Sequence, residues 1–327
     1  MWRRWLLVVL AFLNVSLGHA AQAQVDEVSA PQLLRQMSDA ARQLEYRGRL
    51  IYMRGHDITT LELLHTRIDG REHERLTQLE GAMAEVIRRG EHVVCVHADQ
   101  TITRLVNRSS VTPFGLHERL GESLPVQYQL QLDGEDRIAG RAVYRMQLLP
   151  LDQFRYGYRL WTDQQSHLLL KSELVDLNGA ALERLEFVSL NLSPNLSAAD
   201  FDVPAALKER ALDSLDSSVQ PHAQVNLTPG WLPQGFIEAD RDVRLSGGKG
   251  QPVAAATYSD GLAAFTLFVE APDQNKHEGA SKIGPTVAIS RLINTADGDW
   301  LVTLVGEVPE LTGERVLASL ALGNSSD

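Results

Sequence analysis

The chain has 327 residues, and its 42 acidic residues outnumber its 31 basic residues, which gives a formal net charge of −11. A nucleic-acid polyanion would be repelled over most of such a surface, so the composition argues against a nucleic-acid partner. Cys95 is the only cysteine, so no intramolecular disulfide can form, and we interpret this residue as a buried small hydrophobe. The length allows two domains of ordinary size, each held by its own core.

The N-terminus has the three-part layout of a secretory signal peptide. Two arginines precede an apolar run at 6–13, and small residues follow that run. Small side chains at the −3 and −1 positions allow a peptidase to close on the chain, so we expect cleavage after Ala20 or Ala23. The alternative is an uncleaved anchor, but 5–17 is shorter than the ~20 apolar residues that a membrane span needs. We therefore expect a signal peptide over 1–23 and an exported, periplasmic protein that does not span a membrane.

The first predicted element of the exported part is an amphipathic helix over 29–44. Apolar residues recur there at spacings of three and four, so they share one helix face. Ser29 and Pro31 form a helix start signal, and Gly48 lies just beyond the predicted end. The residues of the apolar face are Leu33, Leu34, Met37, Ala41 and Leu44.

After this helix the hydrophobic period changes to two. In 126–132 apolar residues alternate with glutamines, and 142–148 and 156–160 repeat the alternation. Asp-Gly and Asn-Gly dipeptides separate such segments, and they supply the positive φ angles of tight hairpins. The five dipeptides are Asp69-Gly70, Asp133-Gly134, Asn178-Gly179, Asp260-Gly261 and Asp297-Gly298. They predict antiparallel β-sheets with some α-helix (an α+β class) rather than parallel β-α-β units.

A change of composition predicts two domains. The polar segment 204–225 shows no strand pattern, although a short helix over 205–215 is an alternative for its first half. We expect a large domain over 24–203, this linker, and a small β-rich domain over 226–327. Apolar segments predict four strands and a final helix in the small domain, at 253–258, 263–269, 287–293, 300–305 and 309–320.

Catalytic and metal-binding signatures are weak throughout. The segment 246–249 has the spacing of a Ser-x-x-Lys pair, but it lies in a glycine-rich turn rather than on the rigid helix that such a nucleophile needs. His92 and His97 lie five residues apart on a predicted strand, so they point to opposite faces. His65 and His73 could face each other across a hairpin, but two histidines alone are a weak metal signal. We predict neither an enzyme, nor a cofactor site, nor a metal site.

Binding could be carried by a cavity in the large domain. A helix that covers the apolar face of a curved sheet incompletely leaves a cavity suited to an acyl chain. A fully packed core is the alternative. Arginines are dense between Arg35 and Arg108, which would suit an anionic ligand or an acidic partner segment.

Candidate partner-binding residues lie in two segments. The first is the Gly-Trp-Leu-Pro-Gln-Gly-Phe run, in which Trp231, Pro233 and Phe236 could form a rigid ledge, because aromatic anchors dominate interfaces. The alternative is a turn whose aromatic side chains fill the small core. The second segment is a charged strand that contains Arg71 and Arg75. It is interpreted as a solvated face, with partner binding as the alternative.

Seven segments carry a resemblance that runs in order over nearly the whole exported part. They are 46–52, 71–76, 85–88, 156–161, 169–172, 230–236 and 258–262. Together they resemble the MucB/RseB family. The resemblance implies a periplasmic negative regulator of the envelope-stress sigma factor sigma-E, or AlgU in the MucB branch. It also implies a large domain like the lipoprotein carriers LolA and LolB, which is an unclosed antiparallel β-barrel with helices in its mouth.

The resemblance also implies partners. Family members bind the periplasmic domain of a transmembrane anti-sigma factor, RseA or MucA, and shield it from the site-1 protease. Lipopolysaccharide or related lipid fragments are expected to release this block, and a homodimer is left open. The family offers no catalytic residues to carry over. The alternative function is a periplasmic lipid or lipoprotein carrier, which would bind acyl chains and ignore the anti-sigma segment.

Overall fold

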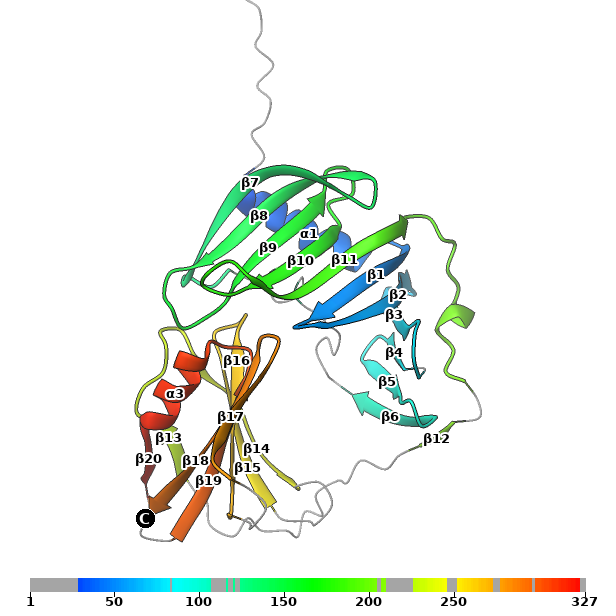
Figure 1. The fold of residues 1–327 in the computed structure, drawn as a ribbon. Coiled ribbons are helices and arrows are strands. Elements are labelled where there is room, and N and C mark those ends of the chain that lie inside the picture. Colours follow the sequence, from blue (N-terminus) through cyan, green and yellow to red (C-terminus); the bar gives the residue numbers. More distant parts are fainter. Residues whose placement is uncertain are drawn as a thin grey trace, which may run out of the picture.

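The computed structural model describes residues 29–82, 84–106, 116, 120, 124–204, 207–209, 226–245, 252–272, 277–295 and 298–323. The predicted signal peptide and the turn at 246–249 lie outside these residues, as does most of the predicted linker. Two large sheets account for most of the described chain (Figure 1). Within that part of the chain, no helix is long and apolar enough to cross a membrane.

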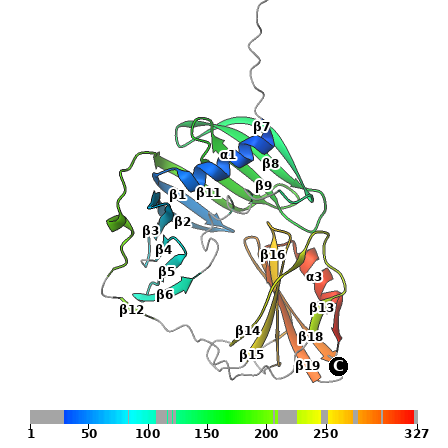
Figure 2. The same ribbon diagram turned by 180° about the vertical axis from the view of Figure 1, so that it is seen from behind.

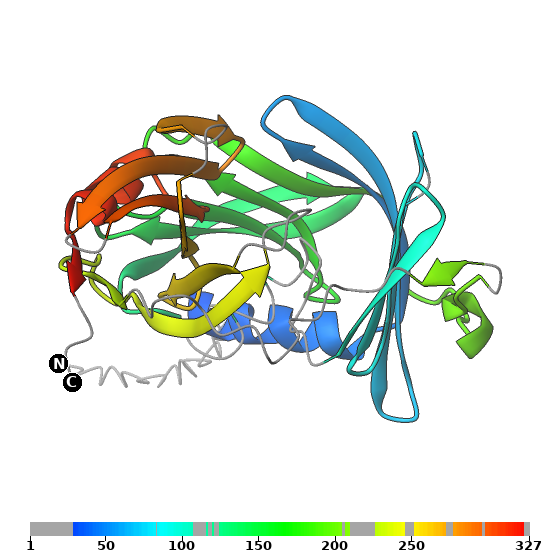
Figure 3. The same ribbon diagram turned by 90° about the horizontal axis from the view of Figure 1, so that it is seen from below.

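The larger sheet has twelve strands in the order β12-β6-β5-β4-β3-β2-β1-β11-β10-β9-β8-β7. Their bounds are β1 (Tyr46–Arg54), β2 (Asp57–Ile68), β3 (Arg71–Gln78), β4 (Glu85–Arg89), β5 (His92–Val96), β6 (Thr101–Val106), β7 (Tyr128–Ile138), β8 (Arg141–Pro150), β9 (Gly157–Asp163), β10 (Leu169–Val175), β11 (Ala181–Asn191) and β12 (Lys208–Glu209). Neighbours are antiparallel except β12 and β6, which are parallel. The outer strands β7 and β12 do not pair with each other. The sheet is therefore curved but unclosed (Figure 3), which confirms the predicted antiparallel class.

Helix α1 (Ala30–Gln43) lies along the inner face of this sheet (Figure 2). A proline stands in its first turn, and its buried residues include Leu33, Leu34, Met37 and Ala41, so the predicted helix and its apolar face are confirmed. Burying one such leucine or methionine is worth ~1.5–3 kcal/mol, so tertiary packing rather than helix propensity holds this short helix. The side chains of the sheet that form one cluster with this helix, called the helix layer below, are Met146, Leu148, Tyr158, Leu160 and Leu174.

The chain that follows β11 covers the outer face of β2 to β6. A 3₁₀ turn, η2 (Ala198–Phe201), buries Phe201 completely in a cluster with apolar residues of β2, β4, β5 and β6. Beyond it, β12 pairs with the start of β6. Neither the strandless linker nor the alternative helix over 205–215 is correct at Lys208–Glu209. A pairing of two residues leaves no period-two pattern for the sequence to display.

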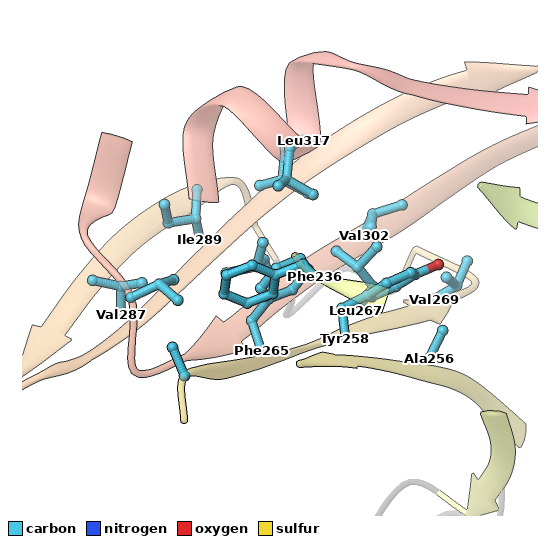
Figure 4. Close-up of a cluster of buried hydrophobic side chains, with 14 residues drawn as sticks. Phe236, Ala256, Tyr258, Phe265, Leu267, Val269, Val287, Ile289, Val302 and Leu317 are labelled. Atoms are coloured by element: carbon cyan, nitrogen blue, oxygen red, sulfur yellow. The ribbon is translucent and has the colours of Figure 1, made fainter. Parts of the chain in front are cut away.

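The small domain is built on a six-stranded antiparallel sheet in the order β14-β15-β16-β19-β18-β17. A helix packs on one face of this sheet, and its Leu317 reaches the core around Phe265 (Figure 4). The four predicted strands and the final helix are confirmed. The bounds are β13 (Asn226–Pro229), β14 (Ile237–Leu245), β15 (Pro252–Ser259), β16 (Ala264–Glu270), β17 (Gly279–Ile283), β18 (Thr286–Thr295), β19 (Gly298–Gly306), α3 (Glu310–Ala318) and β20 (Leu320–Gly323), with β13 and β20 forming a separate pair.

The predicted turns divide into correct and incorrect ones. Asp69 and Gly70 form a two-residue hairpin turn with φ angles of 51° and 75°, as type I′ geometry requires. Asp133-Gly134 is not a turn: β7 continues through it with a register shift between Leu132 and Glu135, so this dipeptide forms a β-bulge. The hairpin turn that ends β7 is instead Ala139-Gly140, with φ angles of 48° and 77°.

Candidate partner-binding site at the domain junction

The predicted ledge lies where the small domain meets the large sheet. Pro233 and Phe236 are buried, and Trp231 is partly buried. The Phe236 ring stacks on Phe265 with the ring centroids 5.5 Å apart, so it belongs to the small-domain core. That is the alternative interpretation of this segment, and partner binding by these residues stays a prediction.

Trp231 contacts the large domain directly. Its ring meets Phe154 edge-on, with the centroids 4.9 Å apart. Arg315 of α3 lies over both rings, 4.1 Å from the Trp231 centroid and 5.3 Å from that of Phe154. The Thr312 hydroxyl donates to the Phe154 carbonyl oxygen at 2.9 Å. An aromatic pair is worth ~0.5–1.5 kcal/mol, and a cation over a ring adds ~0.5–2 kcal/mol, so this cluster ties the β8–β9 loop to α3.

Arg155, the next residue of the same loop, is completely buried at the junction. Its Nε and Nη2 donate to the two carboxylate oxygens of Asp152 at 3.1 and 2.8 Å. Nη2 also donates to the Gln234 carbonyl oxygen at 2.8 Å, and Nη1 bonds to Asp260. The guanidinium lies 5.3 Å from the ring centroid of Phe236. One side chain of the large domain is thus held by two segments of the small domain.

The electrostatics of this cluster favour the charged arginine. Burial alone would lower the pKa of Arg155, but the hydrogen bonds that it donates to Asp152 and the negative charge of Asp260 outweigh burial and raise that pKa. Asp260 is held independently, because its Oδ1 accepts the backbone N–H groups of Leu262 and Ala263 at 2.9 and 2.8 Å. Burial also raises the pKa of the neighbouring Tyr128.

Gly235 is required by the conformation of its backbone, next to the large domain. Its φ angle is +90°, so any other residue here would be strained. A Cβ atom at this position would also lie 2.6 Å from Nε2 of Gln127 in the large domain, and the flexible end of that side chain would have to move. Leu262, from the β15–β16 loop, is buried in the same cluster as α1 and β8.

A second contact joins the β1–β2 hairpin to the small domain. Arg54 bonds to Thr286 and forms an ion pair with Glu307 at 3.3 Å. Nearby, Tyr52 donates to Glu183 at 2.8 Å, and burial raises its pKa. Among the described residues, the small domain thus contacts the large domain around Arg54 as well as around Arg155.

The two candidate arginines of β3 differ in their surroundings. Arg71 is exposed beside the β2–β3 turn. Arg75 is an internal clamp: its Nη2 donates to both carboxylate oxygens of Glu85, at 2.9 and 2.7 Å, and its Nη1 donates to the Asp200 carbonyl oxygen at 3.1 Å. Arg75 therefore fastens the segment that covers the outer face, and the structure does not bring it together with the junction.

An open groove of about 640 Å³ lies on the outer face of β8 to β10. Its walls include Arg145, Arg159 and Trp161, which alternate along β8 and β9 with residues of the helix layer and so face away from α1. On the inner face, Met37 and Leu160 are completely buried where α1 meets the sheet. The contact between α1 and the sheet is thus a packed core, which was the alternative to a cavity. The groove lies on the opposite face of the sheet from the predicted acyl cavity.

Metal-binding constellations are absent from the described residues, in that no three His, Cys, Asp or Glu side chains could hold an ion together. His65 and His73 do not face each other, contrary to the prediction, because the register pairs His65 with Glu74 and Thr66 with His73. The two histidines therefore lie on opposite faces of the sheet. Cys95 is half-buried rather than buried, and its burial raises the pKa of its thiol.

Comparison with known proteins identifies the family. Residues 29–205 match the MucB/RseB N-terminal domain, and residues 221–321 match the MucB/RseB C-terminal domain. The chain belongs to the MucB/RseB family. Among curated relatives, the sigma factor AlgU regulatory protein MucB of Pseudomonas aeruginosa is 34% identical over 88% of this chain and 89% of its own length. The sigma-E factor regulatory protein RseB of Escherichia coli K12 is 26% identical over 96% and 97%.

Solved MucB structures cover nearly all of the chain. MucB in complex with MucA(peri) superposes with a TM-score of 0.72 at 32% identity, over 91% of this chain and 100% of that one. The Pseudomonas aeruginosa MucA/MucB complex gives 0.74 with the same identity and coverage. Another crystal structure of MucB gives a TM-score of 0.59 at 30% identity, over 90% of this chain and 98% of that one. The MucB/RseB family consists of regulatory binding proteins rather than enzymes, and the predicted family is confirmed.

Sequence reasoning found the 230–236 segment but missed its counterpart in the large domain. Phe154 and Arg155 lie in a short loop between β8 and β9, and their contacts with the small domain are at least 77 and 79 residues away, beginning at Trp231 and Gln234. The available signal was an arginine flanked by two aromatic residues in a loop. That pattern predicts a packed loop but not the surface against which it packs.

Proposed function

We propose that this protein binds the periplasmic segment of a membrane-spanning anti-sigma factor and so restrains an envelope-stress sigma factor of the sigma-E type. The observation that carries the proposal is the similarity to MucB along nearly the whole chain, including MucB in complex with MucA(peri). The signal-peptide layout at 1–23 supports a periplasmic location, where such a segment would be accessible.

The proposed mechanism is occlusion. The bound anti-sigma segment is shielded from the site-1 protease, so the sigma factor stays sequestered while the complex lasts. Lipopolysaccharide or a related lipid fragment releases the segment by binding an arrangement of the protein that cannot hold it. Linkage then requires each ligand to lower the affinity for the other by the same factor.

The proposed partner surface draws on both candidate segments. Arg71 is exposed and Trp231 is partly exposed, so these two side chains can contact a partner directly. Pro233, Phe236 and Arg75 are engaged in internal contacts. We expect these three to support the partner surface rather than to form it.

The testing experiment is a calorimetric titration of residues 24–327 with the purified periplasmic segment of the cognate anti-sigma factor. Tight one-to-one binding, together with slower cleavage of the segment by the site-1 protease, is the expected result. The titration is then repeated with lipopolysaccharide, which should weaken the binding. If the segment does not bind while acyl ligands do, the regulator proposal fails and the lipid or lipoprotein carrier takes its place.

A further inference from the structure

We propose that Arg155 is a positioning residue for partner binding, which latches the β8–β9 loop onto the small domain and so holds the two domains in the orientation that binds the partner. This inference rests on the proposed function, because it names the arrangement of domains that the anti-sigma segment binds. The latch is defined as residues 151–156, the loop that joins β8 to β9.

The latch is built from contacts on three separate parts of the small domain. Phe154 packs against Trp231, and its carbonyl oxygen accepts the Thr312 hydroxyl. Arg155 reaches Asp260 and the Gln234 carbonyl oxygen. Rotation of the small domain relative to the large sheet would break some of these contacts, because they involve three different segments of the small domain.

Arg155 is the member of the latch whose loss should matter most. Its guanidinium is 0% exposed and all three of its nitrogens donate hydrogen bonds. Asp260, whose side chain is also 0% exposed, is fixed by backbone N–H groups of its own loop. If Arg155 were neutralised, the Asp260 carboxylate would remain at the junction without its counter-charge. Removing one partner of a buried pair is strongly destabilising, and separation of the domains would relieve the cost by returning water to the carboxylate.

The link between the latch and partner binding comes from the solved relatives. The two MucB structures that contain MucA superpose on this latched chain with TM-scores of 0.72 and 0.74, whereas the MucB structure that names no MucA gives 0.59. Sequence identity, at 30–32%, and coverage of this chain, at 90–91%, are nearly equal in the three comparisons. The latched chain is thus more similar to the two structures that contain MucA than to the third MucB structure, and we assign the latched arrangement to the partner-binding state.

The test combines a distance measurement with a binding measurement on residues 24–327. Spin labels at Asp69 and Asp299, two exposed positions in different domains, report the domain orientation in a Cys95→Ser background. The main variant is Arg155→Met. Its matched control is Arg141→Met, which removes an arginine from an ion pair with a nearly buried carboxylate inside the large domain.

The expected result for Arg155→Met is a broader distance distribution and a rise of about ten-fold in the Kd for the anti-sigma segment, because apparent affinity falls with the fraction of competent protein. The double variant Arg155→Met, Asp260→Asn should recover most of the affinity, since the completely buried carboxylate is then gone and Asp152, which also loses its arginine, is partly exposed to water. Arg141→Met should change neither the distance nor the Kd. If Arg155→Met does not fold, Arg155→Lys tests the same point, because it keeps the charge but not the forked hydrogen bonds.

Two results would overturn the proposal. One is a folded Arg155→Met protein with the wild-type distance distribution, which would show that Arg155 does not set the orientation. The other is a broadened distribution with unchanged affinity, which would show that orientation does not control binding. If the wild-type protein fails to bind the segment at all, the proposed function fails, and the distance measurement still decides whether Arg155 latches the domains.

Discussion

The ion pair between Arg141 and Asp163 allows a prediction about stability and pH. The Asp163 side chain is 2% exposed, and Oδ2 accepts Nε of Arg141 at 2.6 Å. Oδ1 accepts the backbone N–H and the hydroxyl of Ser166 at 2.7 and 2.9 Å. Burial opposes ionisation of Asp163, but the hydrogen bonds from Arg141 and Ser166 outweigh it and lower its pKa from 3.8 to about 2.

The perturbation is Asp163→Asn. A pKa difference of this size corresponds to about 2 kcal/mol of stability at neutral pH, and solvent around the partly exposed Arg141 reduces this to ~1–2 kcal/mol. Because the folded pKa is the lower one, the stabilisation is fully present above the unfolded pKa of 3.8 and is lost as the pH falls from there toward 2. The asparagine cannot ionise, so its contribution is independent of pH.

The assay is urea unfolding of the wild type and of Asp163→Asn at pH 7 and pH 3. A second measurement is hydrogen exchange in peptides from β8 and β9. We expect the variant to be less stable at pH 7 by ~1–2 kcal/mol, and the gap to narrow by up to about 1 kcal/mol at pH 3. Because the two proteins are compared at the same pH, the contributions of the other carboxylates to the pH dependence of stability cancel. A difference in the free energy of unfolding between the two proteins that is the same or larger at pH 3 would refute the reasoning.

Three further predictions concern the packing, a turn and the partner surface. Phe201→Ala should lower the free energy of unfolding by about 3–4 kcal/mol and release the chain after β11 from the outer face, seen as new cleavage by trypsin near Lys208; an unchanged digestion pattern would contradict this. Ala139→Asn should raise stability by ~0.5–1 kcal/mol, because asparagine tolerates the positive φ of this turn; thermal unfolding that shows a loss would count against the turn assignment. Trp231→Ala should raise the Kd for the anti-sigma segment about ten-fold, while Trp231→Phe stays within about three-fold; equal Kd values for the two variants would remove Trp231 from the partner surface.

The regular elements could be predicted because their patterns are local. The apolar face of α1 follows from residue spacing alone, and the Asp69-Gly70 turn follows from a dipeptide between two alternating strands. The same reasoning failed at Asp133-Gly134, because a bulge and a tight turn both use a glycine with positive φ. What separates them is whether the chain reverses direction, and that depends on the partner strand β8.

Only the small-domain part of the candidate site could be predicted from the sequence. Trp231 and Phe236 are conspicuous as aromatic residues between proline and glycines, but their neighbours Phe154 and Arg155 are distant in the sequence. Charge was misleading as well, since Arg75 is a clamp for the chain around Asp200 rather than a free cation. Pairings between separate loops are set by the whole fold, so a single sequence without its fold does not reveal them.

The free edge of β7 bears on how an unclosed sheet avoids sticking to copies of itself. An exposed strand edge is a template on which another chain can add a strand. Here the edge carries the bulge at Gly134, followed by the exposed charged residues Glu135, Asp136 and Arg137. A bulge twists the edge away, and an added strand would have to bury these charges. The protein can therefore keep its barrel open without offering a long, flat edge for aggregation.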